Sequence, residues 1–97
     1  MTTVVNKHKD RYDTYIGRGS VYGNPFIISK DNTREAVLLN FTKYFYDKVD
    51  KDPEFKKQVL LLKDCRLGCF CKPEACHGDI IAEYVNNYWT KVEAVVS

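Results

Sequence analysis

One stretch of the sequence predicts both the fold and the site, and it reads Leu67-Gly68-Cys69-Phe70-Cys71-Lys72-Pro73-Glu74-Ala75-Cys76-His77-Gly78-Asp79. The apolar run from Leu67 to Cys71 is too short for a helix, which favours a central strand. From Cys76 onward, apolar residues recur at the spacing of a helix with one buried face. These residues are Ile80, Ile81, Tyr84, Val85, Tyr88 and Trp89. The stretch therefore predicts a buried strand that leads through a short loop into a helix.

Two further strands are predicted near the amino terminus, at Val4–Asn6 and Thr14–Ile16, where β-branched and aromatic side chains gather. Two helices are expected to follow them. The first is expected after Asn32, a residue type that caps helices, with Glu35 placed to bond back to it. The second is expected at Asp52-Pro53, because proline is well tolerated in the first turn of a helix.

The predicted order of elements is β-β-α-α-β-α. A chain of 97 residues is long enough for one domain only, residues 1–97. Strands separated by helices favour parallel pairing, so we expect a small single-domain α/β fold, a Rossmann-like sheet flanked by helices. For the tail from Thr90, a helix end and a small extra strand at Val92–Val96 both fit the pattern.

Composition narrows the class of protein. Hydrophobic residues make up 44% of the chain, which is typical of a globular protein. A net charge of +2 gives no support to nucleic-acid binding. No run reaches the ~20 apolar residues of a membrane span, and the first residues lack the apolar core of a signal peptide. We therefore expect a cytoplasmic protein without membrane partners. Because so short a chain buries only a thin core, a homodimer is also compatible with the sequence.

The predicted helix start at Cys76-His77-Gly78-Asp79 has the chemistry of a binding site. Backbone N–H groups at a helix start lack intrahelical partners, and the helix dipole favours an anion there. The same field leads us to expect the pKa of the Cys76 thiol below that of a free cysteine. His77 is a residue type that exchanges protons near neutral pH, and Gly78 permits close approach of another backbone or of a ligand.

Three interpretations of the cysteines stay open at this point. Four zinc-ligand types occur together at Cys69, Cys71, Cys76 and His77, but the spacing C-x-C-x4-C-H differs from usual structural zinc sites. Cysteines also pack as small apolar residues, which is the interpretation we favour for Cys69 and Cys71. For Cys76 and His77, capping of the helix and a role in ligand binding are equally compatible with the sequence. We predict no bound metal and no cofactor.

A second candidate segment, the glycine-rich loop Gly17-Arg18-Gly19-Ser20-Val21-Tyr22-Gly23-Asn24-Pro25-Phe26, follows the predicted second strand. Arg18 is suited to grip a phosphate or carboxylate, while Ser20 and Asn24 add neutral hydrogen-bonding groups. The predicted ligand-binding residues are Gly17, Arg18, Gly19, Ser20, Asn24, Pro25, Cys71 and Gly78. The alternative is an ordinary turn whose Arg18 pairs with a surface acid. Because both segments follow parallel strands, we expect them to meet at one edge of the sheet.

Several motifs together resemble the domain of unknown function 4326 family, over roughly Val4 to Tyr84. They are Val-Val-Asn-Lys, Tyr-Ile-Gly-Arg-Gly-Ser, Gly-Asn-Pro-Phe, Thr-Arg-Glu-Ala and Leu-Gly-Cys-Phe-Cys-Lys-Pro-x-x-Cys-His-Gly-Asp. The resemblance implies an α/β fold and a protein found in bacteria and their phages, so a short copy is expected to be phage-encoded and to act in the host cytoplasm. The Cys-His segment is also similar to another uncharacterised family, in which arginine stands at the position of Gly78.

The leading functional hypothesis is a small α/β protein that binds a nucleotide- or nucleoside-like anionic molecule between the loop Gly17–Phe26 and the helix start Cys76–Asp79. Were it an enzyme acting on glycosidic or phosphate bonds, His77 or Asp79 would be the acid or base and Cys76 a nucleophile. The alternative hypothesis is a zinc-stabilised protein-interaction module built on the Cys/His cluster.

Overall fold

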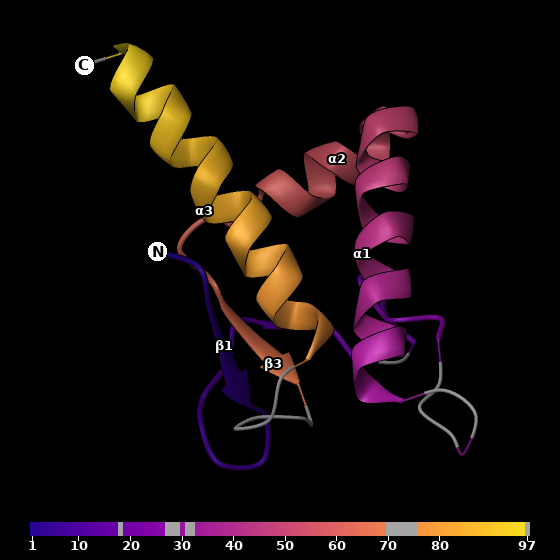
Figure 1. Cartoon of the computed structure of the whole chain (residues 1–97). Coiled ribbons are helices and arrows are strands. Elements are labelled where there is room, and N and C mark those ends of the chain that lie inside the picture. Colours follow the sequence, from indigo (N-terminus) through magenta and orange to yellow (C-terminus); the bar gives the residue numbers. More distant parts are fainter. Residues whose placement is uncertain (18, 27–29, 31–32, 70–75, 97) are drawn as a thin grey trace.

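The sheet in the computed structural model of the chain has three parallel strands. Strand β3 (Arg66–Cys69) lies between β1 (Thr3–Asn6) and β2 (Thr14–Tyr15), as Figure 1 shows for β1 and β3. The structure describes residues 1–17, 19–26, 30, 33–69 and 76–96. The prediction of a central strand is confirmed, and the part of it at residues 70–71 lies outside the described residues.

Helix α1 (Arg34–Lys51) presents Phe41 and Phe45 to the core. Its cap differs from the prediction. Thr33 caps the helix, and its hydroxyl oxygen accepts a hydrogen bond from the Ala36 N–H at 3.2 Å. The expectation that Asn32 is the cap is therefore wrong, because the helix begins one residue later.

Helix α2 (Pro53–Leu60) begins as predicted. The Asp52 side chain accepts a hydrogen bond from the Phe55 N–H at 3.1 Å, and Pro53 occupies the first turn. Asp52 also ends α1, since its own N–H donates to the Lys48 carbonyl. One residue therefore terminates one helix and caps the next, so the two helices meet at an angle instead of continuing as one (Figure 1).

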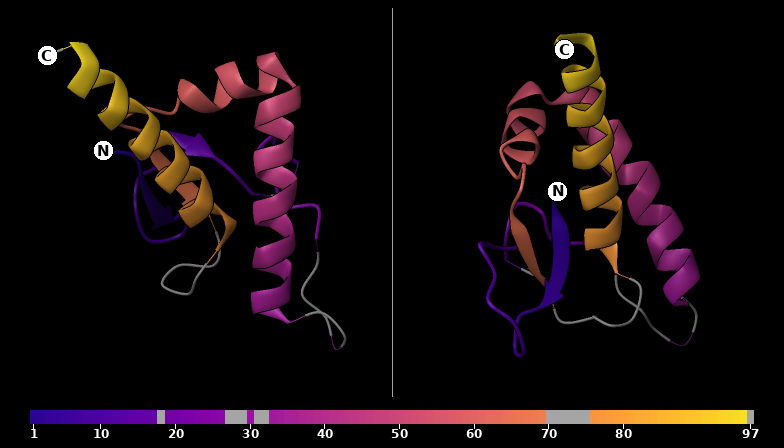
Figure 2. Two further views of the ribbon diagram at one scale, coloured as in Figure 1. Left: turned by 45° about the horizontal axis from the view of Figure 1, so that its top comes forward. Right: turned by 90° about the vertical axis from the view of Figure 1, so that its left-hand side faces the viewer.

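Helix α3 (His77–Val96) runs to the end of the described chain and buries Ile81 and Val85 completely. The residues from Thr90 onward continue this helix, so the alternative of an extra strand at Val92–Val96 is wrong. Figure 2 (right) shows the sheet on one side of α3 and α1 on the other. None of the described helices is long and apolar enough to cross a membrane.

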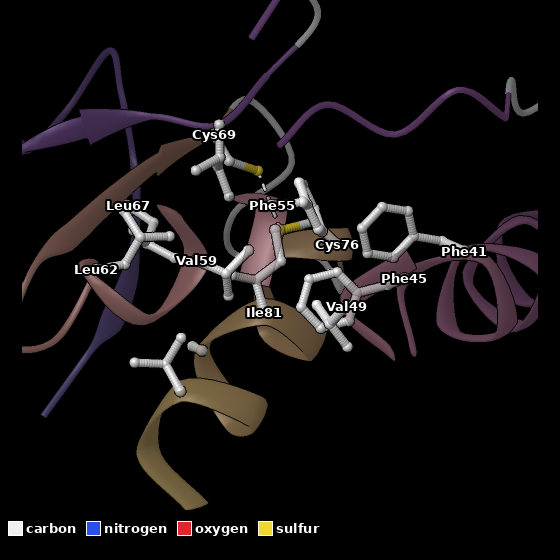
Figure 3. Close-up of a cluster of buried hydrophobic side chains, with 13 residues drawn as sticks. Phe41, Phe45, Val49, Phe55, Val59, Leu62, Leu67, Cys69, Cys76 and Ile81 are labelled. Atoms are coloured by element: carbon white, nitrogen blue, oxygen red, sulfur yellow. Dashed lines mark hydrogen bonds between the residues drawn. The ribbon is translucent and has the colours of Figure 1, made fainter. Parts of the chain in front are cut away.

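The elements follow one another as β1, β2, α1, α2, β3 and α3, and every helix contributes to one buried cluster. Figure 3 shows this cluster, in which Phe41 and Phe45 of α1 and Ile81 of α3 converge near Cys76. The expectation of a small α/β domain with parallel pairing is confirmed. The first turn of α3 sits beside this core, so the residues of the predicted site are part of the packing.

Candidate functional site

The loop after β2 and the start of α3 meet through one buried hydrogen bond. The His77 Nε2 atom lies 2.7 Å from the Ile16 carbonyl oxygen, and the His77 side chain is only 8% exposed. Because a carbonyl oxygen only accepts, Nε2 carries the proton in this contact. The ring also packs edge-on against Phe41, with ring centroids 5.2 Å apart. His77 therefore joins β2 to α3 and α1.

Gly78 lies where Val4 of β1 and Ile16, which directly follows β2, press closely on α3. A Cβ atom at this position would come within 2.5 Å of Ile16 Cδ1 and 3.1 Å of Val4 Cγ1. Gly78 is predicted to permit a close approach, and the neighbours that approach it in the structure are protein side chains. A side chain here would push the first turn of α3 away from the sheet.

The environment of Cys76 overturns one expectation about its chemistry. The Cys69 thiol donates to the Cys76 sulfur at 3.0 Å, and Cys76 is only 2% exposed (Figure 3). The contact with Cys69 raises the pKa of the Cys76 thiol, burial raises it further, and the Gly78 N–H beside the sulfur opposes them only in part. The expectation of a lowered pKa is wrong, because contact and burial outweigh the field of the helix start.

Asp79 completes the start of α3. Its Oδ2 atom accepts a hydrogen bond from the Cys76 N–H at 3.2 Å, which is the reciprocal bond of a capping box. The Asp79 N–H in turn donates to the Cys76 carbonyl at 3.0 Å. Asp79 is half-buried, whereas Cys76, His77 and Gly78 are buried. Of the four residues predicted at this helix start, Asp79 is thus the one that reaches solvent.

The glycine-rich loop is shaped by its own hydrogen bonds. The Gly17 carbonyl accepts from both the Ser20 N–H at 3.2 Å and the Ser20 hydroxyl at 2.7 Å. The Asn24 side-chain oxygen accepts from the Phe26 N–H at 2.9 Å, and Pro25 beside it is exposed. Gly19 adopts a φ of +90°, a conformation that side chains rarely take. These hydrogen bonds define one turn between Gly17 and Ser20 and another between Asn24 and Phe26.

Two of the predicted ligand-binding residues, Arg18 and Cys71, lie outside the described residues. Within the described residues, no group of three or more His, Cys, Asp or Glu side chains is placed to hold a metal ion. Cys69 packs in the core as we favoured for it.

Sequence reasoning missed the partner that matters most to His77. The carbonyl of Ile16 belongs to an apolar residue, and no side-chain pattern marks a backbone oxygen as the acceptor of a distant histidine. The available signal was the expectation that the segments after β2 and β3 meet. The contact of His77 with Ile16, the residue just before the loop Gly17–Phe26, is compatible with that expectation.

We predict that His77→Ala lowers the free energy of unfolding by about 1–3 kcal/mol, because it leaves the buried Ile16 carbonyl without its partner. Urea denaturation followed by circular dichroism measures this change. His8→Ala is the control, since His8 is exposed and its loss should change the value by less than about 0.5 kcal/mol. A His77→Ala variant as stable as the parent would show that His77 does not hold the two segments together.

A parallel sheet with a shaped loop and a capped helix start at one edge is the architecture of a small α/β protein. The model of one family, described as Domain of unknown function (DUF4326), matches residues 3–87. The chain belongs to this family, which confirms the resemblance seen in its motifs.

The chain is also similar to a protein of Enterobacteria phage T4, described as "Uncharacterized 12.4 kDa protein in nrdA-td intergenic region". The two are 44% identical over 84 residues, which cover 86% of this chain and 76% of the phage protein. This similarity confirms the phage association expected for the family. No solved structure matches the chain significantly.

Proposed function

We propose that the protein binds a nucleotide- or nucleoside-like anionic small molecule at the carboxyl edge of a Rossmann-like sheet. The ligand lies between the loop Gly17–Phe26 and the helix start Cys76–Asp79. The observation that carries the proposal is the bond between His77 and the Ile16 carbonyl, which links the residue between the end of β2 and the loop to the first residue of α3. Ligands of open α/β sheets bind at that edge.

The burial of the residues at this helix start supports ligand binding over catalysis. Cys76 and His77 are buried and hold structural contacts, so they position the site and do not reach the ligand. Asp79 is half-buried at the same helix start, where a carboxylate is suited to accept hydrogen bonds from ribose hydroxyl groups. Arg18 is the proposed partner of the ligand's phosphate.

The loop has an open side at Gly19. Gly19 is exposed, and among the described residues that are not its chain neighbours, none has an atom within 4 Å of a Cβ built at this position. Its backbone therefore faces open space next to the ordered turn between Gly17 and Ser20. The similarity to a phage T4 protein supports a phage-encoded protein that acts in the cytoplasm of a bacterial host.

Thermal unfolding with a panel of nucleosides, nucleotides, ADP-ribose and inorganic phosphate tests this function. A true ligand at about 100 times its Kd stabilises the fold by about 2.7 kcal/mol, which raises Tm by roughly 11–22 °C in a chain of this size. Asp79→Asn should remove most of the shift. Glu83→Gln is the control, because Glu83 is exposed one turn further along α3.

The proposed function fails if no compound in the panel raises Tm. It also fails if Asp79→Asn and Glu83→Gln respond to the compounds as the parent does. A shift produced equally by inorganic phosphate alone would assign the site to a simple anion and not to a nucleoside.

A further inference from the structure

A concave surface lies between α2 and α3, away from the sheet edge. Its volume is about 350 Å³, within the range of small binding pockets. The residues that line it are Pro53, Lys56, Lys57, Leu60, Leu61 and Trp89. Trp89 stands twelve residues after His77 on α3, which places it roughly 18 Å along the helix from the proposed ligand site. We call this surface the Trp89 groove.

The floor of the Trp89 groove is apolar and has its polar groups satisfied. The Trp89 Nε1–H donates to the Leu60 carbonyl at 3.0 Å, so the indole ring lies against the end of α2. Leu61 follows directly and is 71% exposed, so the groove presents a large aliphatic side chain to solvent. The floor therefore offers apolar contact, and its indole N–H and the Leu60 carbonyl are bonded to each other.

The rim of the Trp89 groove is positively charged. Both charged residues that line it are lysines, Lys56 and Lys57, and no acidic residue belongs to the lining. In the described part of the chain, neither lysine forms an ion pair. Lys63 lies over the Trp89 ring at 4.9 Å from its centroid but pairs with Glu93. An apolar floor with an uncompensated cationic rim is complementary to an acidic segment that carries a large apolar side chain.

We propose that the Trp89 groove docks a short acidic peptide segment of a partner protein, with one leucine- or phenylalanine-like side chain inserted against Trp89. A second copy of this chain is a poorer occupant, since a two-fold contact would bring the lysines of both copies together. A nucleotide is also a poorer occupant, because the side chains that line the groove offer lysine donors but no acceptor for a base edge. The inference is independent of the proposed ligand site.

Trp89 is the single tryptophan of the chain, so its fluorescence reports on the groove directly. The experiment selects binders from a random-peptide library on the folded protein and then titrates the enriched peptides, synthesised without tryptophan, against Trp89 emission. We expect acidic peptides with one or two large apolar residues, which shift the emission and bind more weakly in high salt.

Two matched double variants test whether binding depends on the positive charge at the groove or on the net charge of the whole protein. Lys56→Glu with Lys57→Glu should weaken binding by about tenfold or more, because attraction at the rim becomes repulsion. Lys9→Glu with Lys43→Glu changes the net charge equally at exposed positions elsewhere and should leave binding unchanged. Circular dichroism verifies that both double variants fold.

Three outcomes would overturn the docking site. The first is a library that gives no enrichment over a blank surface. The second is a set of enriched peptides that lack acidic residues, and the third is equal weakening of binding by the two double variants. A concentration-dependent shift of Trp89 emission without peptide, together with a dimer in sedimentation, would assign the groove to a second copy instead. None of these results depends on whether the nucleotide-like ligand binds at the sheet edge.

Discussion

Replacing Phe41 by alanine is expected to lower the free energy of unfolding by about 3–5 kcal/mol, as is typical of a buried phenylalanine. Phe41 is only 1% exposed, stacks on Phe45 at 5.7 Å and packs edge-on against His77. The substitution removes a ring contact within α1 and one with α3, and it leaves a cavity beside the start of α3. Because domains of this size are stable by about 5–15 kcal/mol, a large fraction of the total would be lost. Urea denaturation monitored by circular dichroism measures the change.

Leu39→Ala is the matched control for Phe41→Ala. Leu39 lies on the same helix, two residues away, but is 57% exposed. Its loss should change the free energy of unfolding by less than about 0.5 kcal/mol. Equal effects of the two substitutions would contradict the orientation of α1, whose Phe41 face is buried in the structure.

The stability of the protein is expected to fall as the pH rises above 9, because the pKa of the buried Cys76 thiol is raised from its ordinary value of 9.0. Below that pH, Cys76 is protonated in both the folded and the unfolded chain, and its contribution is fully present. Above it, the unfolded chain releases the proton while the folded chain keeps it. The free energy of unfolding then falls by up to about 1.4 kcal/mol per pH unit.

Urea denaturation at several values between pH 8 and pH 10 measures this slope. The window ends there because the raised pKa values of Tyr22, Tyr46 and Tyr84 add further pH dependence above 10.0, the ordinary value for tyrosine. Cys76→Ala should flatten the slope. Cys65→Ala is the control, since that thiol is only half-buried and should leave most of the slope in place. Alkylation of Cys76 in the folded protein as fast as that of a free thiol would contradict its burial.

Much of the helical structure was predictable because its signals are local. Asp52 and Pro53 mark a helix start within two residues, and the structure places the cap there. Along α3, the apolar spacing correctly identifies Ile81 and Val85 as buried. These signals come from residues within one or two helical turns of each other. Residues that are this close in the sequence are also neighbours in the folded helix.

Other features could not be predicted from patterns in the sequence. Asn32 and Thr33 are adjacent residues that both cap helices well, and the exact start of α1 decides between them. The tail at Val92–Val96 has β-branched residues compatible with a strand, but it lies on the continuing α3. The Trp89 groove joins the end of α2 to a residue much later in the chain, so no local spacing indicated it.

The segment Leu67–Asp79 shows which features depend on local sequence and which depend on tertiary packing. By itself, the sequence determined the strand around Cys69, the helix after Cys76 and the family of the chain, because each depends on neighbouring residues. Only tertiary structure decided what the polar residues there do. Packing brings the Cys69 thiol to Cys76 and the Ile16 carbonyl to His77, and burial then sets the direction of the Cys76 pKa. Those partners come from separate elements, and their proximity exists only once the sheet and α3 have packed.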